Sequence, residues 1–198
     1  MEFLLFNKWS TKDIKVDDPG LKKYLNIEPI IVPKSSGRQA KFRFGKTKYH
    51  IVERLMGKMQ VTGHKGKKHK ISSGHLTGKG VHTYNLLIKT FELIEKDTKQ
   101  NPIQVFVKAL ENASPREEIT AIEYGGARYP QAVDCAPQRR LDLAMRQISQ
   151  AAYSKSFDSK KKIHQALAEE IIKAYKMDTT SQALAKKLEL ERQADSSR

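Results

Sequence analysis

The stretch NPIQVFVKALENASPREEITAIEYGGARYPQAVDCAPQRRLDLAM, residues 101–145, carries the local signals that decide the fold. Asn101 followed by Pro102 is typical of a helix start, with asparagine as the cap and proline at the first helical position. The apolar residues that follow recur at helical spacing: Ile103, Phe106, Val107 and Leu110. The stretch therefore begins with an amphipathic helix.

A β-hairpin is predicted after this helix. Residues 114–117 (SPRE) imitate a helix capping box, but two roughly extended segments follow, separated by Gly125 and Gly126. A glycine pair between extended segments is typical of a hairpin turn. Pro130 cannot donate to a hydrogen-bond ladder, so we expect residues 118–134 to form an exposed arm, outside any buried sheet.

Further helices are predicted on both sides of this stretch from apolar residues at helical spacing. The marker residues are Ile51, Val52, Leu55, Met56 and Met59 for residues 49–61; Val81, Tyr84, Leu87, Ile88, Phe91 and Ile94 for the helix after Val81; Leu141, Met145, Ile148 and Ala152, then Ile163, Leu167, Ile171 and Ala174, for two helices after Pro137; and Leu184 and Leu188 for a last helix from about Thr180 to Gln193. The predicted fold class is mainly α: a small helical bundle with a protruding β-hairpin arm and a basic N-terminal extension and loop.

Two regions are predicted from the distribution of turn and breaker signals. Residues 1–37 are interpreted as an N-terminal extension in which residues 30–32 (IIV) form a short strand, and residues 38–198 as the helical domain. Between Arg38 and Tyr49 aromatic residues alternate with cations. Such a pattern is typical of a segment that stacks on nucleobases, but also of an edge strand that packs its phenylalanines on the domain. Both interpretations stay open at this point.

The positive charge of the chain is concentrated in one region. The 198 residues carry a formal charge of +15, and residues 34–80 alone hold 13 basic residues and one acid, Glu53. Residues 81–137 are slightly acidic, and residues 138–198 have a net charge of +5. A basic block of this kind favours a polyanionic partner, because each neutralised phosphate releases counterions.

Residues 63–80, GHKGKKHKISSGHLTGKG, are predicted to be a basic loop, because five glycines interrupt any apolar periodicity. The four histidines in this loop and just after it do not match a zinc motif, since their spacings are five, six and seven: His64, His69, His75 and His82. The string GHLTGKG falls short of a phosphate-binding loop, because only three residues separate Gly74 from Gly78 and Gly80 follows Lys79. We expect no metal and no cofactor.

The single cysteine, Cys135, excludes an internal disulfide and is interpreted as a small packed residue. No pairing of a nucleophile with a base is recognisable, so we expect no catalytic residue. The short apolar run near the N-terminus does not resemble a signal peptide, and no stretch approaches the roughly 18 apolar residues of a membrane span. These features predict a cytoplasmic protein without a membrane partner.

The order of these features resembles the universal family of small-subunit ribosomal protein seven, in its archaeal and eukaryotic branch. The matching strings are IVERLMGKM (51–59), NPIQVFVKALENASPRE (101–117), YGGARYPQAVDCAPQRRLDLAM (124–145), ALAEEII (166–172) and the final SSR. The resemblance covers roughly residues 38–198, and residues 1–37 do not map onto it.

This resemblance implies a structural, non-enzymatic protein of the small ribosomal subunit. The family binds the 3′ major (head) domain of small-subunit rRNA, nucleates head assembly, and places its hairpin near exit-site tRNA and the mRNA path. Implied partners are neighbouring head proteins and small-subunit ribosomal protein eleven, with no homo-oligomer. Carried over by position, the hairpin tip is Tyr124, Gly125, Gly126, Arg128 and Tyr129.

Arginines at a helix start are favourable phosphate ligands, because the helix dipole and free N–H groups also attract anions. Arg139 and Arg140 follow Pro137 in this position. The complete set of predicted RNA-binding residues is Arg38, Lys41, Arg43, Lys46, Lys48, Lys65, Lys67, Lys68, Lys70, Lys79, Arg128, Arg139, Arg140, Arg146, Lys160 and Lys161. A DNA-binding architectural protein and an RNA-processing enzyme are the alternatives from other functional classes.

Overall fold

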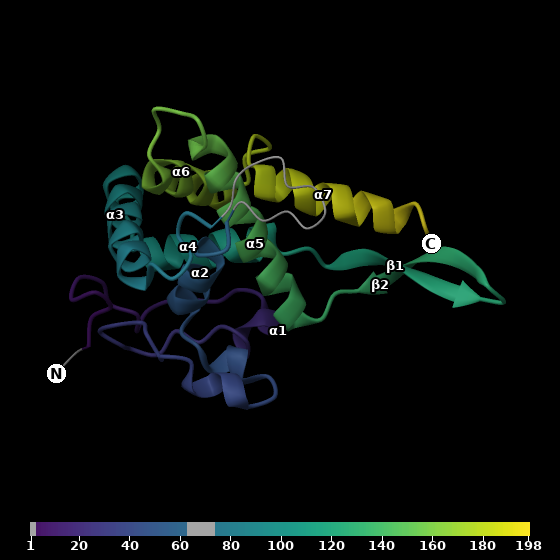
Figure 1. Cartoon of the computed structure of the whole chain (residues 1–198), viewed down its shortest axis with the longest axis horizontal. Helices are drawn as coiled ribbons and strands as arrows, with labels where there is room; N and C mark the ends of the chain where they lie inside the picture. Colours follow the sequence, from purple (N-terminus) through teal and green to yellow (C-terminus); the bar gives the residue numbers. More distant parts are fainter. Residues whose placement is uncertain (1–2, 63–73) are drawn as a thin grey trace.

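The computed structural model of the chain describes residues 3–62 and 74–198 (Figure 1). Its elements, in chain order, are α1 (Pro19–Lys22), the 3₁₀ turns η1 (Arg38–Lys41) and η2 (Gly45–Lys48), α2 (Ile51–Met59), α3 (Gly80–Thr98), α4 (Pro102–Ala113), β1 (Glu117–Tyr124), β2 (Ala127–Asp134), α5 (Pro137–Ser156), α6 (Ile163–Tyr175) and α7 (Gln182–Asp195). The predicted helical bundle with a β-hairpin arm is confirmed.

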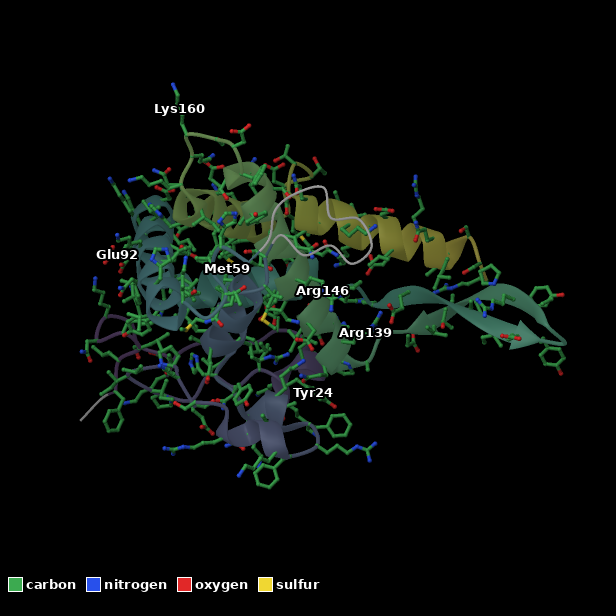
Figure 2. The ribbon with its side chains drawn as sticks, in the orientation of Figure 1. Tyr24, Met59, Glu92, Arg139, Arg146 and Lys160 are labelled. Carbon is green, nitrogen blue, oxygen red and sulfur yellow. The ribbon has the colours of Figure 1, made fainter. Side chains whose placement is uncertain are left out.

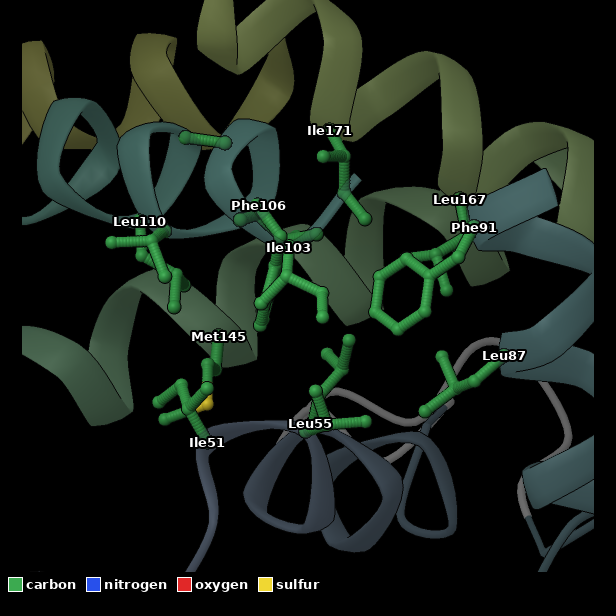
Figure 3. Close-up of a cluster of buried hydrophobic side chains, with 14 of the residues drawn as sticks. Ile51, Leu55, Leu87, Phe91, Ile103, Phe106, Leu110, Met145, Leu167 and Ile171 are labelled. Carbon is green, nitrogen blue, oxygen red and sulfur yellow. The ribbon is translucent and has the colours of Figure 1, made fainter. Parts of the chain in front are cut away.

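Helix α4 occupies the centre of the bundle, where α3, α5, α6 and α7 all contact it. Asn101 caps α4 as predicted, since its side chain accepts a hydrogen bond of 3.0 Å from the backbone N–H of Ile103. Phe106 and its apolar neighbours on α4 are fully buried. Figure 3 shows labelled side chains of α2, α3, α4, α5 and α6 converging on this core.

Among the helices of the described ranges, none has both the length and the apolar character that crossing a membrane requires.

The N-terminal segment contributes to the same core. Leu5, Leu21 and Leu25 are buried, and the rings of Phe6 and Trp9 pack against Phe91 of α3 with centroids 6.2 and 5.8 Å away. The indole N–H of Trp9 donates to Glu95 at 3.0 Å. The residues that the sequence suggests as an extension therefore cover an apolar face of α3.

The strand predictions in the N-terminal third are wrong. Residues 30–32 are exposed and form no strand, and residues 38–48 form η1 and η2 where an edge strand was one alternative. Gly45 explains the second error, because a Cβ there would lie only 1.9 Å from the carbonyl oxygen of Gln39. The backbone folds tightly back on itself at this point, which an extended strand does not do.

The hairpin arm agrees with the prediction. β1 and β2 pair antiparallel from Glu117–Asp134 to Tyr124–Ala127, leaving Gly125 and Gly126 as a two-residue turn. Their φ values of 58° and 83° lie in the left-handed region, which a two-residue turn of this type requires and which glycine adopts without strain. Figure 1 shows the hairpin projecting away from the helices, with α7 beside its base. The SPRE string starts no helix.

The C-terminal helices lie where the sequence predicts them, but only one of the two apolar residues that marked α7 is buried. Leu184 is buried against the bundle, whereas Leu188 is 56% exposed. Glu170 of α6 is fully buried and joins three helices: it accepts from Lys155 of α5, from the Ser181 hydroxyl at 2.7 Å and from the Ala183 N–H of α7 at 3.1 Å. These hydrogen bonds fix the start of α7 to the bundle. The few apolar residues in the sequence of α7 do not indicate this contact.

Acid should destabilise the fold through His50, the N-cap of α2. Its Nδ1 accepts from the Val52 N–H at 3.3 Å, and burial lowers the pKa of His50 from 6.5 to about 4. Between these pH values the unfolded chain takes up a proton that the folded protein resists, so stability is lost as pH falls through this window. We expect a loss of about 2 kcal/mol from pH 7 to pH 5 attributable to His50.

Urea unfolding of the wild type and His50→Asn at both pH values measures this contribution. Asparagine is a good N-cap that does not titrate, so the carboxylates contribute equally to both proteins and the difference isolates His50. An identical pH dependence in the two proteins would show that protonation of His50 is not resisted by the fold.

Candidate nucleic-acid interface

Residues 38–48, here called the aromatic–cation loop, expose two phenylalanines to solvent. Phe42 and Phe44 are 63% and 67% exposed. The Nζ of Lys48 lies 5.6 Å from the ring centroid of Phe42, and the Arg43 guanidinium lies 5.3 Å from that of Phe44. The edge-strand interpretation, in which these rings pack on the domain, is therefore wrong. Exposed aromatic faces next to cations are suited to stacking on bases while holding phosphates.

One carboxylate beside this loop is shared by three cations, which we call the Asp142 cluster. The nearest carboxylate oxygen of Asp142 lies 3.0 Å from Nζ of Lys46, 3.5 Å from Nη2 of Arg54 and 3.6 Å from Nζ of Lys58. The cluster joins η2, α2 and α5. Lys46 belongs to both the cluster and the aromatic–cation loop, so the two features form one continuous surface.

The electrostatics of the cluster show a surplus of positive charge. Burial acts to raise the pKa of Asp142, but the hydrogen bond from Lys46 and the charges of Lys58 and Arg54 hold that pKa below its usual value. The pKa of Lys58 is lowered, first by burial and then by the proximity of Lys46 and Arg146, although Asp142 opposes the shift. A further anion would relieve this repulsion.

Arg54 and Lys58 belong to the candidate interface through Asp142, although the sequence did not indicate them. They lie four residues apart, so they share one face of α2. Asp142 and Arg146 have the same spacing on α5. These two pairs with i, i+4 spacing are the only indication of the cluster in the sequence. Nothing in the sequence near either pair indicates that these faces of α2 and α5 meet.

Arg139 and Arg140 are placed differently from each other at the start of α5. Arg139 is half-exposed and forms a bidentate ion pair with Glu118 of β1, which lowers the pKa of Glu118. Arg140 is largely buried: Nη2 donates to Asp18 at 2.7 Å and Nε to the Pro115 carbonyl at 3.2 Å. Arg140 thus connects the N-terminal segment to the base of the hairpin, and its role in RNA binding stays a prediction.

The other predicted RNA-binding residues are distributed over several elements. Lys79 is exposed at the N-cap of α3, Arg128 pairs with Glu123 at 3.6 Å on the hairpin, and Lys161 pairs with Glu169. Figure 2 shows Arg139 and Arg146 on α5, and Lys160 projecting from the α5–α6 loop at the top of the view, far from Arg139. Four predicted lysines lie outside the described residues: Lys65, Lys67, Lys68 and Lys70.

The hairpin tip presents aromatic side chains to solvent. Tyr124 and Tyr129 are 80% and 59% exposed on either side of the glycine turn. At the other end of the hairpin, Cys135 is buried, and burial together with Glu118 raises the pKa of its thiol to about 11. The thiol therefore stays protonated at neutral pH, as expected for a packed residue and not for a nucleophile.

Comparison with known proteins gives consistent matches along the chain. A family model described as ribosomal protein S7p/S5e matches residues 22–198. The small ribosomal subunit protein uS7 of Nanoarchaeum equitans is 54% identical over 198 residues, covering all of both chains. The protein of the same name from Archaeoglobus fulgidus is 44% identical over 197 residues, covering 100% of this chain and 96% of its own. The similarity thus includes the N-terminal residues.

Proposed function

Because the chain belongs to the ribosomal protein S7p/S5e family, whose members are structural, non-enzymatic components of the small ribosomal subunit in the cytoplasm, we propose that it binds the 3′ major (head) domain of small-subunit rRNA directly and nucleates assembly of the head. The observation that carries this proposal is the continuous surface formed by the aromatic–cation loop and the Asp142 cluster. It combines exposed aromatic rings with cations that outnumber their carboxylate partners.

The start of α5 supports the same proposal. No side chain caps this 20-residue helix, whose first residue is Pro137, so its first N–H groups remain available to an anion. Arg139 is half-exposed beside them and can exchange Glu118 for a phosphate. Arg146 lies two turns further along the same helix, exposed to solvent.

The hairpin is proposed to reach exit-site tRNA and the mRNA path. Its exposed tyrosines and Arg128 at the tip are suited to stacking and phosphate contacts. The same arm, together with the exposed side of α7, is proposed to contact neighbouring head proteins, among them small-subunit ribosomal protein eleven. These contacts are expected to add little to the affinity for isolated rRNA.

The test is a salt-dependent titration of the full chain against a 3′ major domain RNA fragment, with an unrelated structured RNA of equal length as competitor. Selective binding with a steep negative slope of log K against log salt supports the proposal. Equal binding to both RNAs, or equal competition by duplex DNA, would leave only a general polyanion binder and would overturn it.

Replacing Lys41, Arg43 and Lys48 together by alanine should weaken binding about thirtyfold and make the salt slope shallower by about 2 to 3. These cations flank the exposed phenylalanines but do not touch Asp142. The matched control is alanine at Lys89, Lys96 and Lys99, which removes the same charge from exposed positions on and beside α3. Equal losses in the two variants would show that only net charge matters.

A further inference from the structure

A half-open pocket lies over the outer face of α2. Its volume is about 790 Å³, within the range of small-molecule sites. Four parts of the chain line it: residues 32–37, the residues around η2, the outer face of α2 with the residues that follow it, and the first turn of α3. All four residues of the Asp142 cluster belong to the lining as well.

The lining also contains exposed apolar residues. Val32, Val61 and Val81 are 48%, 60% and 69% exposed, and all three line the pocket together with Met56 and Tyr84. Single exposed apolar residues are common on protein surfaces, but their convergence on one concave site indicates a ligand with an apolar face.

The charged part of the lining favours an anion. Lys46, Arg54 and Lys58 share Asp142 there, and all four residues belong to the lining. The side chain of Arg54 is 2% exposed, and its Nε is a buried donor without a hydrogen-bond partner among the described residues. An unsatisfied buried donor is costly, and the three cations outnumber the one carboxylate, so this part of the lining carries net positive charge that suits an anionic group.

Gly57 forms part of the pocket floor in the interior of α2. A Cβ at this position would meet no described atom within 4 Å. Glycine in a helix interior costs about 1 kcal/mol relative to alanine, and neither packing nor a positive φ requires it here. The fold therefore does not explain this glycine, whereas a flat group lying against α2 does.

We infer that the pocket receives one unstacked nucleotide of the bound rRNA, with its base against Gly57 and the valines and its phosphate at the Asp142 cluster. This inference rests on the proposed function, which supplies RNA as the ligand. A nucleotide combines a flat, largely apolar base with an anion at one end, as the lining requires. The aromatic–cation loop, which shares Lys46 with the pocket, would bind the flanking nucleotides.

The test compares Gly57→Phe and Gly57→Ala with the wild type in the salt titration against the 3′ major domain fragment. Phenylalanine fills the floor without altering any charge. We expect its dissociation constant to rise tenfold or more, with a salt slope that becomes shallower by no more than about one, the contribution of a single phosphate. Alanine should stay within twofold of the wild type and raise the melting temperature. Ala185→Phe, on an exposed position of α7, is the matched control and should bind like the wild type.

The possible failures are distinguishable. If the wild type does not prefer the rRNA fragment, the proposed function is wrong. If the wild type binds selectively and a folded Gly57→Phe protein stays within twofold, the pocket does not hold a base, although the proposed function stands. Loss of affinity with a slope shallower by about two or more would mean that phosphate contacts outside the pocket are displaced, and it would also overturn the inference. Should the phenylalanine variant fail to fold, Gly57→Leu provides the same test at lower helix cost.

Discussion

Phe91→Ala is expected to lower the free energy of unfolding by about 4 kcal/mol. Phe91 is fully buried on α3, and its ring lies 6.1 Å from that of Phe106 at the centre of α4. It also contacts Phe6 and Trp9 of the N-terminal segment. Truncation removes the transfer free energy of a benzyl group and leaves a cavity that several rigid elements surround, so the site cannot collapse.

Urea unfolding followed by circular dichroism measures this loss. Phe42→Ala is the matched control, because it removes the same group from a ring that is 63% exposed and should change stability by no more than about 0.5 kcal/mol. Limited proteolysis adds a second observable, since the N-terminal segment should become susceptible only in Phe91→Ala. Equal stabilities of the two variants would contradict the core position assigned to Phe91.

The parts of the fold that the sequence predicts correctly are specified by local interactions. The start of α4 depends on two consecutive residues. Asn101 accepts a hydrogen bond from the backbone N–H two residues later, and Pro102 occupies the first helical position, where no N–H is needed. The hairpin depends on two consecutive glycines at the positions that need positive φ. In each case the residues that determine the element lie within it.

The features that sequence reasoning missed depend on contacts between distant residues. Trp9 is buried because α3 lies beneath it, and its partner Glu95 is 86 residues away. Arg140 is withdrawn from the surface by Asp18, 122 residues earlier in the chain. The residues next to Trp9 and Arg140 in the sequence do not indicate these distant partners. A single sequence therefore predicts an exposed N-terminal segment and an exposed arginine.

The candidate interface shows the same division. The aromatic–cation loop was recognised because its residues alternate along the chain, although the edge-strand alternative was equally compatible with that pattern. The Asp142 cluster was not recognised, because it assembles side chains from three elements and its carboxylate is 88 residues from Arg54. Of its cations, only Lys46 was predicted to bind RNA, and its position beside Asp142 shows how the loop is held to the bundle.

Asp142→Asn is expected to act in opposite directions on stability and on RNA binding. In the free protein it should lower the free energy of unfolding by about 3 kcal/mol, because three cations lose their shared counterion. Arg54 cannot escape this cost by deprotonating, and its side chain is only 2% exposed. If the cluster binds rRNA as proposed, a phosphate takes the place of the lost carboxylate in the complex. Affinity for the 3′ major domain fragment should then rise, and the salt slope should steepen by about one.

Urea unfolding and the salt titration on the same preparations test both halves of this prediction. Asp158→Asn is the matched control, since it makes the same change in charge on the exposed loop between α5 and α6, at a left-handed φ that asparagine tolerates. It should leave stability within about 0.5 kcal/mol. A stable Asp142→Asn protein would show that the carboxylate does not hold the cluster together. Weaker RNA binding by the folded variant would place the cluster outside the interface, because removing a carboxylate from a phosphate-binding surface can only strengthen its attraction for RNA.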